Sequence, residues 1–231
     1  MKKLFFGITL IAISTTIKAQ ESAAINGDFT DLTRTNNAGL LFNPGDNTAK
    51  KYSGSPYLIE EWSEGTVVLG NEGKLERLLL ILDLYKNDLI LKKHPSNISL
   101  PKENIESFSL NVEGETKNFT KISLNDEIRF AEVLYTGELT TLIKIIDITF
   151  VPVTYDQTFK SANPNDEYRR SSKLYMLNDG IAEKIPSGKG GFVKLFPGHE
   201  DEIKDYIKTN QLDLTDEFHL RVLFEYINTL K

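Results

Sequence analysis

Short apolar segments separated by tight turns dominate the middle of this chain, and they restrict its fold more than any other feature. Between residue 57 and about residue 185 these segments are joined by turn sequences such as Lys86-Asn87-Asp88 and Asn178-Asp179-Gly180. Turns of about two to five residues join antiparallel strands, whereas parallel strands need crossovers of about a dozen residues or more. The pattern therefore predicts an antiparallel sheet of roughly nine strands.

Two of the predicted strands are largely apolar on both sides. They lie within residues 78–82 and residues 143–148. Side chains alternate between the two faces of a strand, so a strand that is apolar on both sides must be covered on both faces. We therefore expect residues 56–186 to form a curved antiparallel sheet or a partial barrel.

The period of the apolar pattern changes after Pro186, from that of strands to that of helices. Acidic residues 200–202 lie where a helix begins, Asn210 can end that helix, and Thr215 can cap a second one. The apolar residues of the second helix recur at spacings of three and four, as a buried stripe does: Phe218, Val222, Leu223, Tyr226, Ile227 and Leu230. Residues 187–231 are thus predicted to be a helical hairpin packed on the sheet, which makes the fold class α+β.

The beginning of the chain has the layout of a secretory signal peptide. Lys2 and Lys3 precede an apolar run of about ten residues, and the small residue Ala19 follows a more polar stretch. A helix that spans a bilayer needs about 20 apolar residues, so the run is too short for a membrane anchor. We expect residues 1–19 to be removed, and the turn-rich residues 20–55 to form an extended, loosely ordered arm.

Composition restricts the location and the partners of the chain. It contains no cysteine, which excludes disulfides, thiolate chemistry and a lipoprotein anchor. Its formal net charge is −6, and loss of the leader removes three lysines and no acid. An acidic protein is repelled by nucleic acid and by anionic lipid surfaces. The mature chain is expected to be soluble, in the periplasm or outside the cell, with no nucleic-acid partner and no transmembrane span.

No motif for a metal, a cofactor or a catalytic group stands out. The three histidines are His94, His199 and His219, and no two of them are four residues apart on one helical face. The chain has no Gly-x-Ser-x-Gly motif that would mark a serine nucleophile. We therefore assign no catalytic residue, no metal ligand and no cofactor.

Four residues are candidates for ligand binding. Tyr52, Tyr57 and Trp62 are close in sequence at the start of the predicted sheet, where aromatic side chains either line a ligand pocket or seal the end of a core. Asp147 interrupts an apolar strand, so its carboxylate must be paired or must face a cavity. The adjacent residues 169 and 170 are both arginine, which either meet an acidic partner or pair with neighbouring acids.

Two groups of segments resemble a known family. One is Gly54-Ser55-Pro56-Tyr57-Leu58 with Glu61-Trp62 behind it, and the other is Lys173-Leu174-Tyr175 with Asn178-Asp179-Gly180, followed by the helical residues 192–196, 202–208 and 226–230. Together they resemble an uncharacterised family of small exported proteins common in Bacteroidota. The resemblance covers residue 54 to the end and implies a periplasmic or surface location. It implies no activity and no catalytic residues.

These observations favour an exported, non-catalytic binding or interaction protein of the bacterial cell envelope, with a small ligand or an envelope protein as its partner. The alternative is an envelope hydrolase that acts on glycan or peptide, for which Asp147 is the acid to examine. A purely structural or adhesive role is a third interpretation, which exposed apolar patches would favour.

Overall fold

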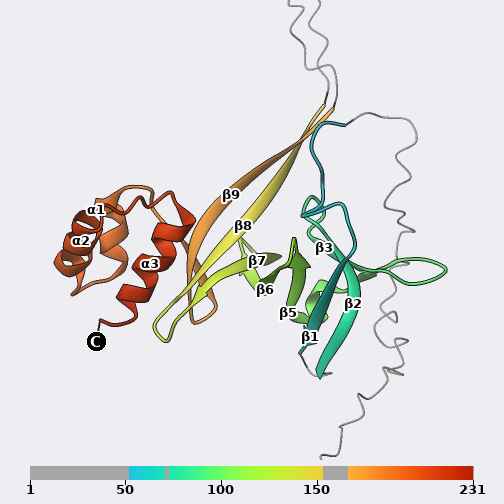
Figure 1. Ribbon diagram of the computed structural model, residues 1–231, viewed down its shortest axis with the longest axis horizontal. Helices are drawn as coiled ribbons and strands as arrows, with labels where there is room; N and C mark the ends of the chain where they lie inside the picture. The colour runs from blue at the N-terminus through green and yellow to red at the C-terminus, as the bar shows by residue number, and fades with distance from the viewer. Residues whose placement is uncertain (1–51, 71–72, 153–165, 231) are drawn as a thin grey trace, which may run out of the picture.

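A computed structural model gives the fold of the protein and describes residues 52–70, 73–152 and 166–230. The predicted signal peptide and residues 20–51 of the predicted arm lie outside these residues. Within them, the strands form one antiparallel sheet that does not close, and the helices lie near the C-terminus (Figure 1). The predicted α+β class is confirmed, and so is a curved antiparallel sheet with C-terminal helices.

The sheet has ten strands in the order β10-β9-β8-β7-β6-β5-β1-β2-β3-β4. The strands are β1 (Ser63–Leu69), β2 (Gly73–Asp83), β3 (Asp88–Leu91), β4 (Ile98–Leu100), β5 (Ile105–Val112), β6 (Glu115–Leu124), β7 (Glu127–Thr136), β8 (Thr141–Val151), β9 (Glu167–Asn178) and β10 (Ile181–Lys184). The helices are α1 (Lys189–Phe192), α2 (Glu200–Thr209) and α3 (Glu217–Ile227), with short 3-10 helices at η1 (Lys102–Asn104) and η2 (Val193–Leu195).

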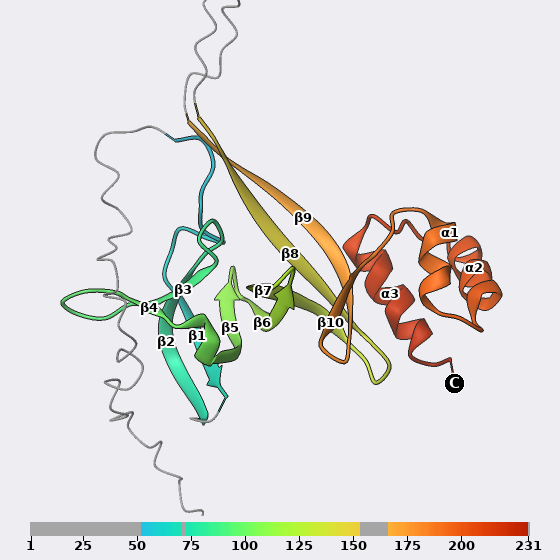
Figure 2. The same cartoon turned by 180° about the vertical axis from the view of Figure 1, so that it is seen from behind.

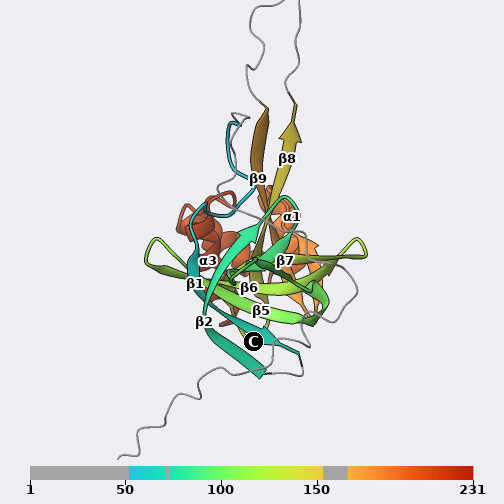
Figure 3. The same cartoon turned by 90° about the vertical axis from the view of Figure 1, so that its right-hand side faces the viewer.

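The β8–β9 hairpin extends beyond the rest of the sheet. β7 pairs with β8 from Thr136↔Thr141 only as far as Glu132↔Lys144, whereas β8 and β9 stay paired without a register shift to Val151↔Glu167. The far half of the hairpin is therefore a two-stranded ribbon, which rises away from β5, β6 and β7 (Figures 1 and 3).

The part of β7 before Glu132 does not pair with β8. A side chain from the β2–β3 turn forms hydrogen bonds with this part instead. Asn87 donates its Nδ2–H to the carbonyl of Ile128 at 2.9 Å and accepts the N–H of Phe130 at 3.0 Å. Asn87 itself has a φ of 56°, a conformation that asparagine tolerates better than most residues. One turn residue thus supplies the donor and the acceptor that a neighbouring strand would supply.

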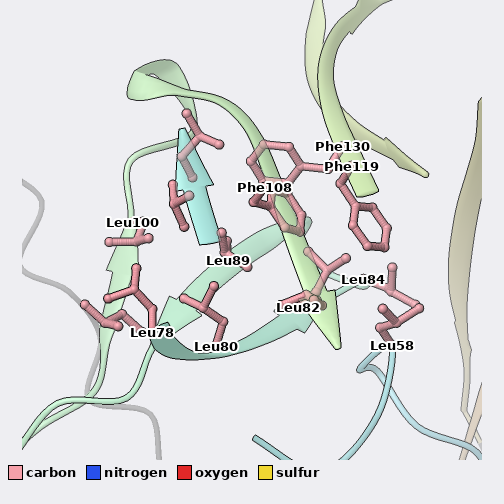
Figure 4. Packing of buried hydrophobic residues seen from close by; sticks show 14 of the residues in the cluster. Leu58, Leu78, Leu80, Leu82, Leu84, Leu89, Leu100, Phe108, Phe119 and Phe130 are labelled. Atoms are coloured by element: carbon pink, nitrogen blue, oxygen red, sulfur yellow. The ribbon is translucent and has the colours of Figure 1, made fainter. Parts of the chain in front are cut away.

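The largest apolar core lies over strands β1 to β7. Phe108 stacks on Phe119 with ring centroids 4.8 Å apart, and Phe130 meets Phe108 edge-on at 5.0 Å. Leucines of β2 and β3 fill the space around these rings (Figure 4). We call this set of buried residues the sheet core.

A second core joins the sheet to the helices. Phe224 and Leu223 of α3 and Phe192 of α1 are buried with Leu142 of β8 and Met176 of β9. Figure 2 shows α3 against the sheet, with α1 and α2 further out. We call this set the helix core, and it packs residues 187–230 onto the sheet. The prediction that Phe218 belongs to the buried stripe of the last helix is wrong, because its side chain is 69 % exposed, and Leu220 and Phe224 are buried instead.

The ends of the helices agree with the sequence at one point and differ at another. Asn210 is the C-terminal cap of α2, as predicted. The predicted cap of α3 at Thr215 is wrong, because Asp216 accepts the backbone N–H of His219 at 2.9 Å. Thr215 instead bonds to Asp213, which fixes the turn before the helix.

The opposite face of the sheet carries a third, smaller core. It contains Ile143 and Ile145 of β8 with Ile122, Ala131 and Tyr175 of the neighbouring strands. Leu142 of the same strand lies in the helix core. β8 is therefore covered on both faces, as expected for a strand that is apolar on both sides.

Candidate functional site

A groove of about 510 Å³ lies between the sheet core and the helices, and we call it the central groove. Leu58 and Val112 on its wall belong to the sheet core, and Ile146 packs against that core. Glu217 of α3 bonds to a lysine on its floor. The lining residues are Leu58, Ile59, Val112, Glu113, Lys117, Glu132, Lys144, Ile146, Arg170, Ser171 and Ser172.

The floor of the central groove is a network of ion pairs around the buried side chain of Glu132. Glu132 accepts hydrogen bonds from Lys117 at 2.8 Å and from Lys144 at 2.9 Å, although only 4 % of its side chain is exposed. Lys144 also donates to Glu217 of α3 at 2.9 Å. The network thus links three strands of the sheet to a helix through charged groups.

Strand register brings these charges together. Glu132 and Lys144 are direct cross-strand neighbours on β7 and β8. Lys117 lies on β6 two residues from Phe119, which is the cross-strand neighbour of Glu132. Direct and diagonal neighbours on one face are within reach of long side chains, so the three side chains meet.

The network moves the pKa values of Glu132 and Lys144 away from neutrality. Burial by itself would raise the pKa of Glu132, but hydrogen bonds from Lys117 and Lys144 outweigh it and lower the pKa below its usual value. Burial would lower the pKa of Lys144, yet its bonds to Glu217 and Glu132 raise it. Glu132 and Lys144 are therefore both charged at neutral pH, and neither exchanges a proton readily there.

Arg170 stands at the β9 side of the central groove and differs from the arginine before it. Its guanidinium donates to the backbone carbonyls of Tyr57 and Leu58. Arg169, by contrast, pairs with Glu167 at 2.8 Å. In the described part of the chain, Arg170 has no carboxylate partner.

Asp147, a predicted candidate, lies in a second groove of about 580 Å³ between the β2–β3 turn, β7 and β8. Its carboxylate accepts hydrogen bonds from Arg129 at 2.7 Å and Lys173 at 3.1 Å. Burial would raise its pKa, but these two cations lower it. A carboxylate held ionised in this way is a poor general acid at neutral pH.

Tyr52 and Tyr57, two of the aromatic candidates, lie where the N-terminal segment meets the β8–β9 ribbon. The Tyr52 ring is 5.5 Å from that of Tyr168 and 6.3 Å from that of Phe150. Burial, and then the nearby charge of Asp83, raise the pKa of the Tyr57 hydroxyl. The Tyr52 ring and the Tyr57 carbonyl thus contact residues of β9.

Trp62 lies apart from the two tyrosines. It lines a third groove of about 540 Å³ with Glu60, Glu61 and Glu64, and the ammonium of Lys92 lies 5.7 Å from the centre of its ring. The three aromatic candidates therefore do not line a single groove.

The sequence interpretation missed the central groove. Lys144 interrupts an apolar strand just as Asp147 does, and Glu132 lies between Phe130 and Leu134 in the same way. A charged residue on a buried face needs a partner, so both were detectable. The pairing of the two was not detectable, because it depends on the register of β7 and β8.

The described ranges hold neither a cluster of metal-ligating side chains nor a helix that could cross a membrane. The histidines, aspartates and glutamates of residues 52–70, 73–152 and 166–230 form no group of three that could hold a metal ion. The helices of these ranges are too short or too polar to cross a bilayer.

Comparison with known proteins gives no relative from which a function could be carried over. The chain matches no family model, no curated protein and no solved structure. The candidate site therefore rests on the geometry and charge of its own residues.

Proposed function

We propose that this chain is an exported, non-catalytic binding protein of the bacterial cell envelope, and that the central groove holds its ligand. The observation that carries the proposal is the groove itself, which combines the apolar wall of Leu58, Ile59 and Ile146 with a buried charged floor. Ligand sites are concave and mostly apolar, with a few fixed polar groups that orient the ligand.

Binding is favoured over catalysis by the protonation states in the two grooves. General acids and bases work best with pKa values near the operating pH. The pKa values of Glu132 and Asp147 are lowered and that of Lys144 is raised, so each group keeps its charge. Fixed charges of this kind orient a bound ligand but do not transfer protons.

A thermal-shift screen tests the groove. Purified residues 20–231 would be mixed with muropeptides, short peptides and fatty acids, because a ligand at a hundred times its Kd adds about 2.7 kcal/mol of stability. Ser172→Trp fills the groove from its β9 side, and Thr149→Trp adds the same ring at an exposed position of β8. We expect one ligand class to raise the Tm of the wild type and of Thr149→Trp, but not that of Ser172→Trp. Equal shifts in both variants, or no shift with any class, would contradict the proposal.

Export is the second half of the proposal and is supported by the layout of residues 1–19. The resemblance of residue 54 onward to exported Bacteroidota proteins supports the same location. Expression in a bacterial host followed by fractionation and intact-mass measurement tests it. We expect a chain that begins at Gln20 in the periplasm or the medium, and an uncleaved chain in the cytoplasm would refute export.

A further inference from the structure

The outer edge of β9 has an open stretch of backbone in its middle. At one end the N–H of Tyr168 donates to the carbonyl of Ser53, and at the other the carbonyl of Leu174 accepts the N–H of Ile185. Outward-facing groups recur at every second residue of a strand, and β8–β9 pairing has no register shift here. Arg170 and Ser172 therefore direct their N–H and C=O groups away from β8, and no other described strand pairs with them.

This stretch is exposed on both faces of the ribbon as well as at its edge. Residues 169–173 are five consecutive exposed residues within β9. The edge of β8 that faces away from β9 is less exposed. Its residues Ile146 and Ile148 are half-buried against the sheet core. The β9 edge is thus the accessible side of the ribbon.

The same stretch is basic in an otherwise acidic protein. Its sequence is Arg-Arg-Ser-Ser-Lys, whereas the whole chain has a formal net charge of −6. Arg169 is paired with Glu167, and Lys173 is paired with Asp147. Arg170 bonds only to carbonyls, so its positive charge is the one in this stretch that no described carboxylate neutralises.

The open edge borders the central groove. Arg170, Ser171 and Ser172 line it from the β9 side. Proteins that bind extended peptides at a sheet edge combine an open backbone, which gives affinity, with adjoining pockets for alternate side chains, which give specificity. The β9 edge and the central groove provide both.

Charge decides which kind of strand can add to this edge. Basic residues on an edge strand protect it from pairing with copies of itself, because two such edges repel each other. A second copy of this chain joined edge to edge is therefore disfavoured. An acidic strand gains from the same charges, and its carboxylate can pair with Arg170.

We propose that an extended acidic segment of a partner protein binds as an added strand along Arg170–Ser172, with alternate side chains in the central groove. The inference deepens the proposed function, on which it rests, by naming an acidic peptide as the ligand.

Three capped hexapeptides test the inference by titration calorimetry against residues 20–231. The first alternates valine and glutamate, the second alternates valine and lysine, and the third is the glutamate peptide N-methylated on alternate amides. We expect the first to bind and the second not to bind. The methylated peptide should bind about ten-fold or more weakly than the first, because it lacks the amides that would donate to the β9 edge.

Two matched pairs of variants place the binding at the β9 edge. Ser172→Pro removes the outward N–H and leaves the β8 pairing intact, whereas Ser172→Ala keeps that N–H. Arg170→Gln removes the unneutralised charge, whereas Arg169→Gln removes one that is already paired. We expect Ser172→Pro to abolish binding and Arg170→Gln to weaken it by up to about five-fold. Arg169→Gln should bind as the wild type does, and Ser172→Ala should retain most of the binding.

The outcomes separate this inference from the proposed function. The inference is wrong if the lysine peptide binds as tightly as the glutamate peptide, or if Ser172→Pro binds the glutamate peptide as tightly as the wild type does. If the glutamate peptide fails to bind at millimolar concentration while Ser172→Trp still blocks another ligand class, the peptide inference fails and the groove proposal stands. If neither peptide nor any other ligand responds to Ser172→Trp, both fail.

Discussion

Glu132 is the residue on which the floor of the central groove depends. Its carboxylate is nearly inaccessible to solvent, and it joins Lys117 to Lys144 across three strands. A buried ion pair adds little compared with an apolar pair of the same shape, but the loss of one partner leaves an uncompensated charge. The free energy of unfolding should therefore be sensitive to the removal of the Glu132 charge.

Glu132→Gln tests this sensitivity. We expect a loss of about 2–4 kcal/mol in the free energy of unfolding, because Lys144 would be left buried with fewer partners. The matched control is Glu106→Gln, which removes a bond to Lys121 of the same 2.8 Å length from a side chain that is 51 % exposed. Urea unfolding should show a loss of no more than about 1 kcal/mol for the control. Equal losses in the two variants would contradict the account of the floor.

The lowered pKa of Glu132 also predicts how stability depends on pH. A carboxylate whose folded pKa lies below its unfolded value of 4.5 stabilises the protein above that value, and the contribution is lost as the pH falls through the folded pKa. Urea unfolding of wild type and Glu132→Gln from pH 7 to pH 3 measures it. The difference between the two should be constant near neutrality and shrink below about pH 4.5. A difference that grows on acidification would mean that the pKa is raised.

At the scale of elements, Asn87 joins the β2–β3 turn to β7. In the described part of the chain, it is the one side chain that bonds to the free edge of β7. Its amide replaces a missing strand at Ile128 and Phe130. The same turn borders the groove that holds Asp147. The position of the β2–β3 turn against β7 therefore depends on a side chain rather than on a continued ladder.

Asn87→Ala should cost about 2–3 kcal/mol of stability, from two lost hydrogen bonds and a positive φ. Asn125→Ala is the control, because Asn125 has a similar φ of 53° in the β6–β7 turn and no side-chain bond among the described residues. Chemical denaturation should give about 1 kcal/mol for Asn125→Ala. If the two variants lose the same amount, Asn87 acts only through its backbone conformation.

The elements that the sequence predicted and those that it missed differ in one physical respect. Strands that bury one or both faces carry an apolar pattern, and these were found. The start of β9 was predicted too late, at Lys173 instead of Glu167, because residues 169–172 are exposed on both sides and carry no apolar alternation. β4 was missed because it has only three residues. Hydrophobic periodicity thus gives no signal for the stretch that forms the inferred binding edge.

At the scale of the whole molecule, one continuous sheet connects two cores on the side that faces the helices. The sheet core and the helix core have no buried residue in common, and the charged floor lies between them. Continuous strand pairing from β10 to β4 should nevertheless make them unfold together, as single domains usually do.

Phe224→Ala tests this coupling from the helix core. Removal of a fully buried ring should cost about 3–5 kcal/mol, whereas Phe218→Ala in the same helix removes a ring that is 69 % exposed and should change stability by no more than about 0.5 kcal/mol. Trp62, the only tryptophan, reports on β1 at the far side of the sheet. Its fluorescence transition should shift together with the circular dichroism transition of the helices. A tryptophan transition that does not move would show that the two cores unfold independently.

Amide hydrogen exchange along β9, followed by NMR, tests the binding edge most directly. In the free protein the amides of Ser171 and Lys173, which face β8, should exchange slowly, and those of Arg170 and Ser172 should exchange fast. Addition of the valine–glutamate peptide should slow Arg170 and Ser172 and leave Ser171 and Lys173 unchanged. Slow exchange at Arg170 and Ser172 in the free protein, or no change on addition of a peptide that binds, would contradict the account.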